Sequence, residues 1–291
     1  MTENSQFPPP LPKIDTTVPH SARIWNYWLG GKDNYPVDQE AGEQYAAIFP
    51  GIIDVARVQR HFLARAVRFL ADEAGIRQFL DVGTGLPTVD NTHEVAQRTA
   101  PDCRVVYVDN DPLVLVHARA LLTSSTEGSC DYIDADLHDP DTILDAAAAI
   151  MDFSRPVGLM LMGIMGHITD GDAYPIVARL VSALPSGSYL TLADGADVSE
   201  AFQKAQEGYN NSGAVPYYLR SPGQIARFFE NLELIEPGVV PCADWRPDPS
   251  PFTPPTEAYV YGGVGRKALP GQWPRPCARG ILAAAPPRIR N

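Results

Sequence analysis

The chain has 291 residues, and its 35 acidic and 23 basic residues give a formal net charge of −12 at pH 7. An acidic surface repels phosphate backbones and anionic lipids, which disfavours nucleic acid and membrane surfaces as partners. Hydrophobic residues make up 45% of the sequence, which excludes wholesale disorder. The length fits one large α/β domain or two small ones.

The cysteines and the apolar runs bear on the compartment. The four cysteines stand far apart with no C-x-x-C pair, which fits a reduced compartment and predicts no structural zinc site. The N-terminus lacks the apolar segment of a secretory signal, and the longest strongly apolar run, residues 157–166, is too short to span a bilayer. We therefore expect a cytoplasmic protein with no metal and no membrane partner, of an oligomeric state that the sequence does not indicate.

Two short helices are predicted near the N-terminus, after a proline-rich arm. Residues 21–29 place aromatic and aliphatic side chains close together behind Ser21, a candidate N-cap, and Gly30 and Gly31 end the segment. A second helix is predicted over residues 37–48.

The middle of the chain alternates between short apolar runs and segments of helical periodicity. Such alternation is typical of a parallel sheet covered by helices on both faces. The predicted strands lie at 78–83, 104–109, 131–134, 157–164 and 188–194, and the predicted helices at 52–74, 92–99, 113–122, 141–151 and 173–184.

The pattern loosens after residue 194. Two further helices are predicted at 198–208 and 222–232, the second with Ser221 as its N-cap. Two further strands, 234–240 and 258–264, predict a hairpin that closes one edge of the sheet.

A glycine-rich turn follows the first predicted strand, in the segment Asp81-Val82-Gly83-Thr84-Gly85. A dinucleotide site needs a third glycine where this chain has Thr88, and the next helix starts too late to place its N-terminus on a pyrophosphate. S-adenosylmethionine (SAM) carries no phosphate, and the carboxylate of Asp81 suits its ammonium group and sulfonium. We therefore predict that Asp81, Gly83, Thr84 and Gly85 bind SAM; the alternative for Asp81 is a carboxylate that caps nearby amides.

Carboxylates also end the second and third predicted strands. Asp109, followed by Asn110, is placed to accept two hydrogen bonds from a ribose diol. Asp136 is favoured over Asp134 as the acceptor of the adenine amino group, because Leu137 then offers the ring an apolar contact. Ligands of open α/β sheets bind at the carboxyl ends of the strands, so the three features together indicate one nucleoside site.

With these motifs the chain resembles class I SAM-dependent methyltransferases. More narrowly, it resembles a bacterial family that is common in high-GC Gram-positive bacteria and was long catalogued as a domain of unknown function. The resemblance implies a Rossmann-like α/β fold: a seven-stranded, mostly parallel sheet with its last strand antiparallel, and SAM as cofactor. It implies no particular acceptor. The matching segments, which span roughly residues 19–267, are 22–34, 78–88, 93–97, 107–112, 134–140 and 262–267.

The resemblance also divides the chain. We expect an N-terminal arm and helical lid over residues 1–50, a SAM-dependent methyltransferase domain over 51–267 and a proline-rich tail over 268–291. In the lid, Arg23 or Lys32 is expected to bind the methionine carboxylate, and Tyr27 to cover the sulfonium by a cation–π contact. The alternative is that the helix only packs and its charges only face solvent.

His167 follows the fourth predicted strand. The resemblance places this position opposite the transferred methyl group, where a histidine can act as general base for an oxygen or nitrogen acceptor. The alternative is a histidine that is hydrogen-bonded at a strand end. Gly163 and Ile164 are expected to line the cofactor site through their backbone. The remaining histidines show no metal-binding spacing and are expected on the surface or in helix packing, at positions 20, 61, 93, 117 and 138.

Aromatic residues gather in the segment after residue 198. They indicate either an acceptor pocket for an apolar or aromatic small molecule, or the packing of a helix pair. These residues are Phe202, Tyr209, Tyr217, Tyr218, Phe228 and Phe229.

The sequence therefore predicts a SAM-dependent methyltransferase for a small-molecule acceptor, directed at oxygen or nitrogen. The alternative is a SAM-binding regulatory or assembly protein without transfer activity. An NAD-dependent oxidoreductase is disfavoured by Thr88 and by Asp81.

Overall fold

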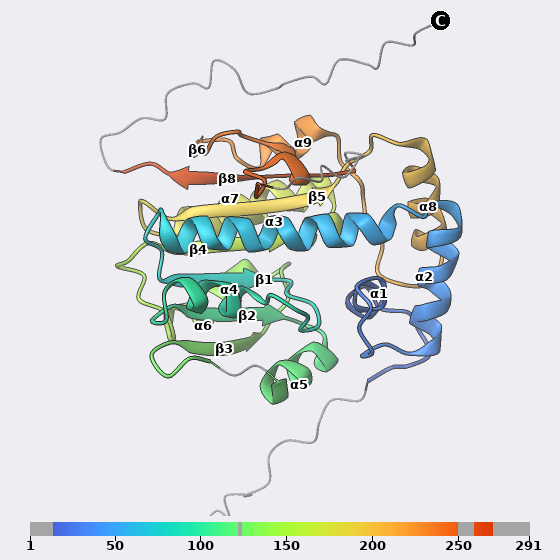
Figure 1. The fold of residues 1–291 in the computed structure, drawn as a ribbon, viewed down its shortest axis with the longest axis horizontal. Coiled ribbons are helices and arrows are strands. Elements are labelled where there is room, and N and C mark those ends of the chain that lie inside the picture. The colour runs from blue at the N-terminus through green and yellow to red at the C-terminus, as the bar shows by residue number, and fades with distance from the viewer. Residues whose placement is uncertain (1–13, 122–123, 250–258, 270–291) are drawn as a thin grey trace, which may run out of the picture.

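The computed structural model describes residues 14–121, 124–249 and 259–269. These residues form a mostly parallel β-sheet with helices on both faces (Figure 1), which confirms the expected α/β class. The strands are β1 (Gln78–Val82), β2 (Arg104–Asp109), β3 (Ser129–Asp134), β4 (Gly158–Met162), β5 (Tyr189–Gly195), β6 (Leu232–Leu234), β7 (Val240–Pro241) and β8 (Val260–Lys267). The α-helices are α1 (Ser21–Trp28), α2 (Pro36–Ile48), α3 (Ile52–Asp72), α4 (Thr92–Thr99), α5 (Pro112–Leu121), α6 (Pro140–Ala148), α7 (Asp170–Ala183), α8 (Glu200–Asn210) and α9 (Pro222–Arg227).

The order of the strands creates a switch point at the centre of the sheet. The order is β3-β2-β1-β4-β5-β8-β6, so the chain leaves β1 to one side for β2 and β3 and to the other side for β4 and β5. These five strands are parallel, whereas β8 runs antiparallel to β5. The loops that follow β1 and β4 therefore lead away from each other at the carboxyl ends of these two neighbouring strands. Open α/β sheets bind their ligands in the crevice at such a point.

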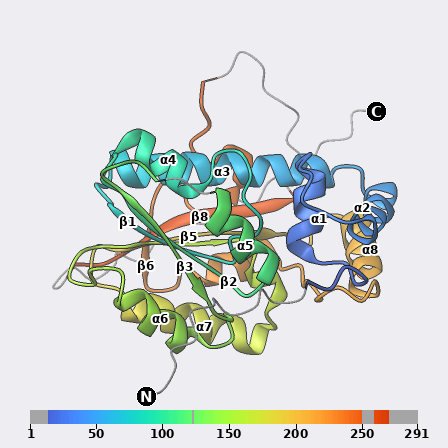
Figure 2. The ribbon, with the colours of Figure 1, turned by 90° about the horizontal axis from the view of Figure 1, so that it is seen from below.

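Both faces of the sheet are buried. Seen from below, α3 and α4 cover one face and α6 and α7 cover the other (Figure 2). The long helix α3 has apolar side chains at helical spacing, and Phe62, Ala66 and Leu70 are fully buried on its inner side. Because both faces are covered, the central strands are apolar throughout: every residue of β1 is buried.

The N-terminal helices lie beyond the carboxyl ends of the strands. There α1 and α2 pack with α8 at one end of the molecule (Figures 1 and 2). The predicted N-cap of α1 is wrong by one residue: His20 has extended backbone angles and its ring nitrogen accepts from the Ala22 amide at 3.3 Å, while Ser21 is already helical.

The C-terminal edge differs from the predicted hairpin. The expected strand over 234–240 is divided into β6 and β7, and both pair with β8. Between them Pro237 has no amide hydrogen for a strand ladder, and Gly238 turns the chain with a φ of +93°. The sheet consequently has eight strands instead of the predicted seven, with the last strand antiparallel as expected.

Some predictions fall on residues outside the described ranges. Residues 1–13 of the arm, the tail from residue 270 and residues 250–258 between β7 and β8 are among them. Within the described residues, no helix is long and apolar enough to cross a membrane.

Candidate functional site

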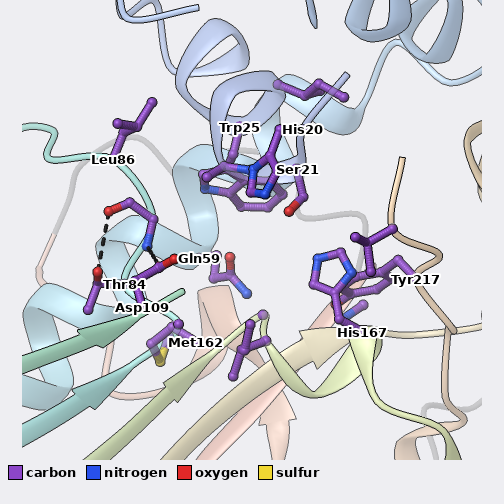
Figure 3. A pocket seen from close by; sticks show the side chains of 18 of the residues that line it. His20, Ser21, Trp25, Gln59, Thr84, Leu86, Asp109, Met162, His167 and Tyr217 are labelled. Carbon is purple, nitrogen blue, oxygen red and sulfur yellow. Dashed lines mark hydrogen bonds between the residues drawn. The ribbon is translucent and has the colours of Figure 1, made fainter. Parts of the chain in front are cut away.

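A cavity of about 350 Å³ opens at the carboxyl ends of β1 to β4. Helix α1 and the residue before it cover the cavity from above, where Figure 3 shows Trp25, His20 and Ser21. Asp109 and Thr84 lie at one side of the cavity, and His167 and Tyr217 lie at the other. Of the residues predicted to form the site, the cavity is lined by Asp81, Gly83, Thr84, Gly85, Asp109, Asn110, Asp136, Leu137, Gly163, Ile164 and His167.

The backbone of the glycine-rich turn lies directly against the loop that follows β4. Gly83 has a φ of +72°, and a Cβ atom there would come within 2.4 Å of the Ile164 side chain. Only glycine fits such a position without a shift of its neighbour. The turn thus presents bare backbone to the cavity, and α4 starts only at Thr92, as the sequence predicted.

Asp81 is a buried carboxylate at the end of β1. It is 4% exposed, and its Oδ2 atom accepts a hydrogen bond from the Thr92 hydroxyl at 2.6 Å. Burial raises the pKa of Asp81 to about 6, against the opposing effects of Thr92 and of the Arg60 guanidinium. Near pH 6 the carboxyl group is therefore about half ionised, and a cation bound beside it would favour its charged form.

Arg60, on α3, brings a positive charge to the same end of the cavity. Its guanidinium donates to the Thr88 hydroxyl in the glycine-rich loop, and its buried Nε has no hydrogen-bond partner among the described residues. Burial lowers the pKa of Arg60, and nearby Asp81 partly offsets this. A buried N–H without a partner is costly, so this group is suited to a ligand that brings an acceptor.

Asp109 ties the glycine-rich turn to the end of β2. Its two carboxylate oxygens accept from the backbone amides of Gly85 at 3.0 Å and of Asp111 at 2.9 Å. Burial raises the pKa of Asp109, although these two amides oppose the shift. The carboxylate is thus fixed in orientation and still has lone pairs for hydroxyl donors.

Asp136 ends the row of carboxylates after β3. Its oxygens accept from the amide and ring nitrogen of His138, both at 2.8 Å, and from the Asn110 amide at 3.3 Å. Burial alone would raise the pKa of Asp136, but these hydrogen bonds bring it below its usual value. The group stays charged at neutral pH, and Leu137 beside it is buried at the cavity wall.

His167 lies on the opposite side of the cavity from Asp109 (Figure 3). Its Nδ1 atom is 2.9 Å from the Pro216 carbonyl oxygen, which can only accept, so Nδ1 carries the proton and Nε2 keeps its lone pair. Burial lowers the pKa of His167, so the ring is neutral at pH 7. The Tyr217 ring packs edge-on against it, with the ring centroids 5.1 Å apart.

A buried carboxylate accepts a hydrogen bond from the Tyr217 hydroxyl and so fixes the position of this ring. Asp194 is 1% exposed; its Oδ1 accepts from the Tyr217 hydroxyl at 2.6 Å and from the Gly166 amide at 3.3 Å. Arg220 is also 1% exposed, with one guanidinium nitrogen 3.8 Å from Asp194 Oδ2. Burial raises the pKa of Asp194 to about 6, although Tyr217 and Arg220 act against this.

Three residues predicted to bind the cofactor lie outside the cavity lining. Arg23 is buried in an ion pair with Asp38, at 3.1 Å, and donates to two backbone carbonyl groups. The Tyr27 hydroxyl donates to Glu43 at 3.0 Å, and Lys32 is exposed. The expectation assigned the charged and tyrosine side chains of this segment to the cofactor, whereas Arg23 and Tyr27 on α1 are directed toward residues of α2 and Lys32, after the helix, faces solvent.

Other lining residues were missed or assigned differently. Gln59 and Arg60 are part of a regular amphipathic helix, and His20 and His138 were expected on the surface or in packing; no sequence signal distinguished them. The predicted aromatic group is divided: Phe202, Tyr209 and Tyr217 line the cavity. The rest do not, since Tyr218 is 43% exposed and Phe228 and Phe229 are buried in the core on the α6–α7 face.

The Arg23–Asp38 pair gives a test of this correction. Arg23→Ala leaves the buried Asp38 charge without its partner, which we expect to cost about 3–5 kcal/mol of unfolding free energy. Arg57→Ala removes an exposed pair with Asp54 and should cost less than about 1 kcal/mol. Urea unfolding measures both. Unchanged stability of Arg23→Ala together with a loss of SAM affinity would instead support the original expectation.

The buried Asp194 predicts a pH dependence of stability. Its pKa is higher in the folded than in the unfolded chain, so its contribution is present below about pH 4 and is lost as pH rises toward 6. Asp194→Asn should reduce the fall in unfolding free energy between pH 4 and pH 7 by about 2–3 kcal/mol. The exposed Asp197→Asn is the control. Equal slopes for Asp194→Asn and the wild type in urea unfolding would contradict the assignment.

Comparisons with known proteins agree with this geometry. Residues 9–268 match the sequence model of the S-adenosyl methyltransferase family. A DUF574 family protein from Streptomyces avermitilis is 44% identical, with a TM-score of 0.84 over 88% of this chain and 100% of its own. A candidate methyltransferase from Thermobifida fusca is 41% identical, with a TM-score of 0.81 over 91% of this chain and 100% of its own.

More distant structures share the fold alone. An O-methyltransferase family protein from Burkholderia thailandensis is 13% identical, with a TM-score of 0.51 over 80% of this chain and 60% of its own. A search of curated proteins finds no significant match. Because the family match spans most of the sequence and both closer structures align over their full length, this chain belongs to the S-adenosyl methyltransferase family.

Proposed function

We propose that this protein transfers a methyl group from SAM to an oxygen or nitrogen atom of a small-molecule acceptor. One observation carries the proposal: carboxylates from the ends of three neighbouring parallel strands, Asp81, Asp109 and Asp136, line a single cavity that continues to His167. The three carboxylates would match the amino-acid, ribose and adenine parts of SAM, and His167 would match a proton acceptor.

The nucleoside part of SAM fits the wall formed by β2 and β3. Asp109 is held by two backbone amides and would accept hydrogen bonds from the ribose hydroxyls. Asp136 would accept from the adenine amino group, with Asn110 and Leu137 beside it. Gly83 and Gly163 would keep the floor of the site free of side chains, since both have positive φ angles and a Cβ atom at either would meet a neighbouring side chain.

The amino-acid part of SAM is a zwitterion, and a matching pair of charges, one from β1 and one from α3, lies beside the glycine-rich loop. Asp81 would face the ammonium group, and the Arg60 guanidinium would bind the carboxylate. Arg60 thus takes the role that the sequence assigned to Arg23 or Lys32. The partnerless Nε of Arg60 supports this assignment, because a carboxylate would satisfy it.

SAM, when bound, supplies a methyl group on a sulfonium that is already a good leaving group. The protein therefore has to hold the acceptor, exclude water and receive a proton. His167 Nε2 would take the proton from the acceptor while the acceptor lone pair forms the new bond to carbon; the electron pair of the broken carbon–sulfur bond remains on sulfur. The helical segment up to residue 50, with α1 as the cavity wall, would serve as the cover that excludes water.

Isothermal titration calorimetry with SAM and S-adenosylhomocysteine, and with NAD as the control ligand, tests the cofactor. Two exposed aspartates at the end of β3 give a matched pair: Asp136 lines the cavity and Asp134 does not. Asp136→Ala should weaken SAM binding by about tenfold or more, because hydrogen bonds to charged groups contribute about 1.5–3 kcal/mol. Asp134→Ala should bind SAM as the wild type does. No binding of either adenosyl ligand to the wild type would refute the proposal.

Asp81 predicts that SAM binding depends on pH. Its pKa of about 6 should fall when the ammonium group binds beside it, so binding near pH 6 releases a proton. SAM affinity should then rise by about fivefold from pH 5 to pH 7 if the pKa falls by one unit, and by at most about tenfold if it falls further. Calorimetry in buffers of different ionisation enthalpy measures the released proton. Asp81→Asn should abolish the pH dependence, and a buffer-independent enthalpy in the wild type would count against this role.

A further inference from the structure

The cavity is divided by charge into two parts. Among its lining residues in the described chain, the acidic side chains are the three strand-end aspartates and the arginine is Arg60, all beside the proposed SAM site. The remaining walls come mostly from α1, α2, α8, the segment after α8 and the start of β8, and they contain aromatic, aliphatic and neutral polar side chains. These walls include Ile24, Trp25, Trp28, Tyr45, Phe202, Gln206, Tyr209, Val215, Tyr217 and Val260.

The aromatic walls are fixed by their own packing. The Tyr45 ring is in edge-to-face contact with Trp28, Phe202 and Tyr209, with centroid distances of 5.1, 6.4 and 6.4 Å. A hydrogen bond of 3.1 Å from the Tyr45 hydroxyl to Gln206 adds to this order. Ordered aromatic walls favour a flat aromatic ligand, because ring pairs contribute beyond the apolar area that they bury.

Two neutral polar features lie in this part of the cavity. His167 is the proton acceptor proposed above. The Tyr209 hydroxyl lies near the Ser21 hydroxyl but is buried without a hydrogen bond of standard geometry among the described residues. Tyr209 and Ser21 both line the cavity, so they can bind a neutral polar substituent of the acceptor.

We propose that the acceptor is an uncharged, planar aromatic molecule whose hydroxyl or ring N–H group lies at His167 and whose second, neutral polar substituent lies at Tyr209 and Ser21. A carboxylate or an ammonium group on the acceptor would lose its hydration against these aromatic and aliphatic walls. His20, at the start of α1, already lies 3.1 Å from the Asp111 carboxylate. This inference rests on the proposed function.

Three matched probes test the inference by ligand-observed NMR and calorimetry on the protein saturated with S-adenosylhomocysteine. Methyl 6-hydroxy-2-naphthoate is neutral and planar, 6-hydroxy-2-naphthoate is its anionic counterpart, and methyl 6-hydroxydecahydro-2-naphthoate is neutral but not planar. We expect the planar ester to bind at least about tenfold more tightly than either of the others. Equal or tighter binding of the anion or of the saturated ester, or no binding of the planar ester at millimolar concentration, would overturn the proposal.

Two tyrosine variants place the second polar contact. Tyr209→Phe keeps the ring and should weaken binding of the planar ester by about three- to tenfold. 2-Naphthol, which lacks the carbonyl group, should bind to this variant and to the wild type with the same affinity. Tyr218→Phe removes an exposed hydroxyl in the same region and should change neither. Equal loss of both probes in Tyr209→Phe would contradict a hydrogen bond from Tyr209. Binding of S-adenosylhomocysteine is measured first on each sample; its absence would refute the proposed function, and with it this inference.

Discussion

The contact between Gly83 and Ile164 is the constraint on which the site depends. It joins the loops that follow β1 and β4, the two central strands from which the chain continues to opposite sides of the sheet. A side chain at Gly83 would separate these loops, and the cavity floor would no longer be continuous from the glycine-rich turn to His167. Because β1 is buried throughout and β4 is buried except at its last residue, neither loop can move without disturbing the core.

Charge is distributed along this floor in a way that follows from burial. The carboxylates of Asp81 and Asp109 are held at the sheet edge where few water molecules can solvate them, which raises both pKa values. Asp136 is more exposed and is held charged by His138. A cationic ligand would therefore be stabilised most at the Asp81 end, whereas the aromatic end of the cavity would favour a neutral ligand.

The wall that α1 and α2 contribute to the cavity is stabilised by interactions that do not involve a ligand. The buried Arg23–Asp38 pair joins α1 to α2, and Asp38 also accepts from the backbone amides of His20 and Tyr35. These contacts set the start of both helices. As a result Trp25 and Trp28, and not the charged residues of α1, face the cavity.

The sequence by itself determined the alternating strands and helices and the three strand-end carboxylates that line the cavity, and its family resemblance indicated the antiparallel last strand. Asp81, Asp109 and Asp136 could be found because strand-end positions are local features, and parallel strands bring their carboxyl ends to one edge. Only the tertiary structure decided which cation reaches that edge. Arg60 is one residue in an amphipathic helix with several arginines, and Arg23 stands in a more distinctive motif, but the direction of each side chain depends on how its helix packs. The broken C-terminal strand and the aromatic wall shared by α1, α2 and α8 were likewise decided by packing between segments distant in sequence, which no local pattern records.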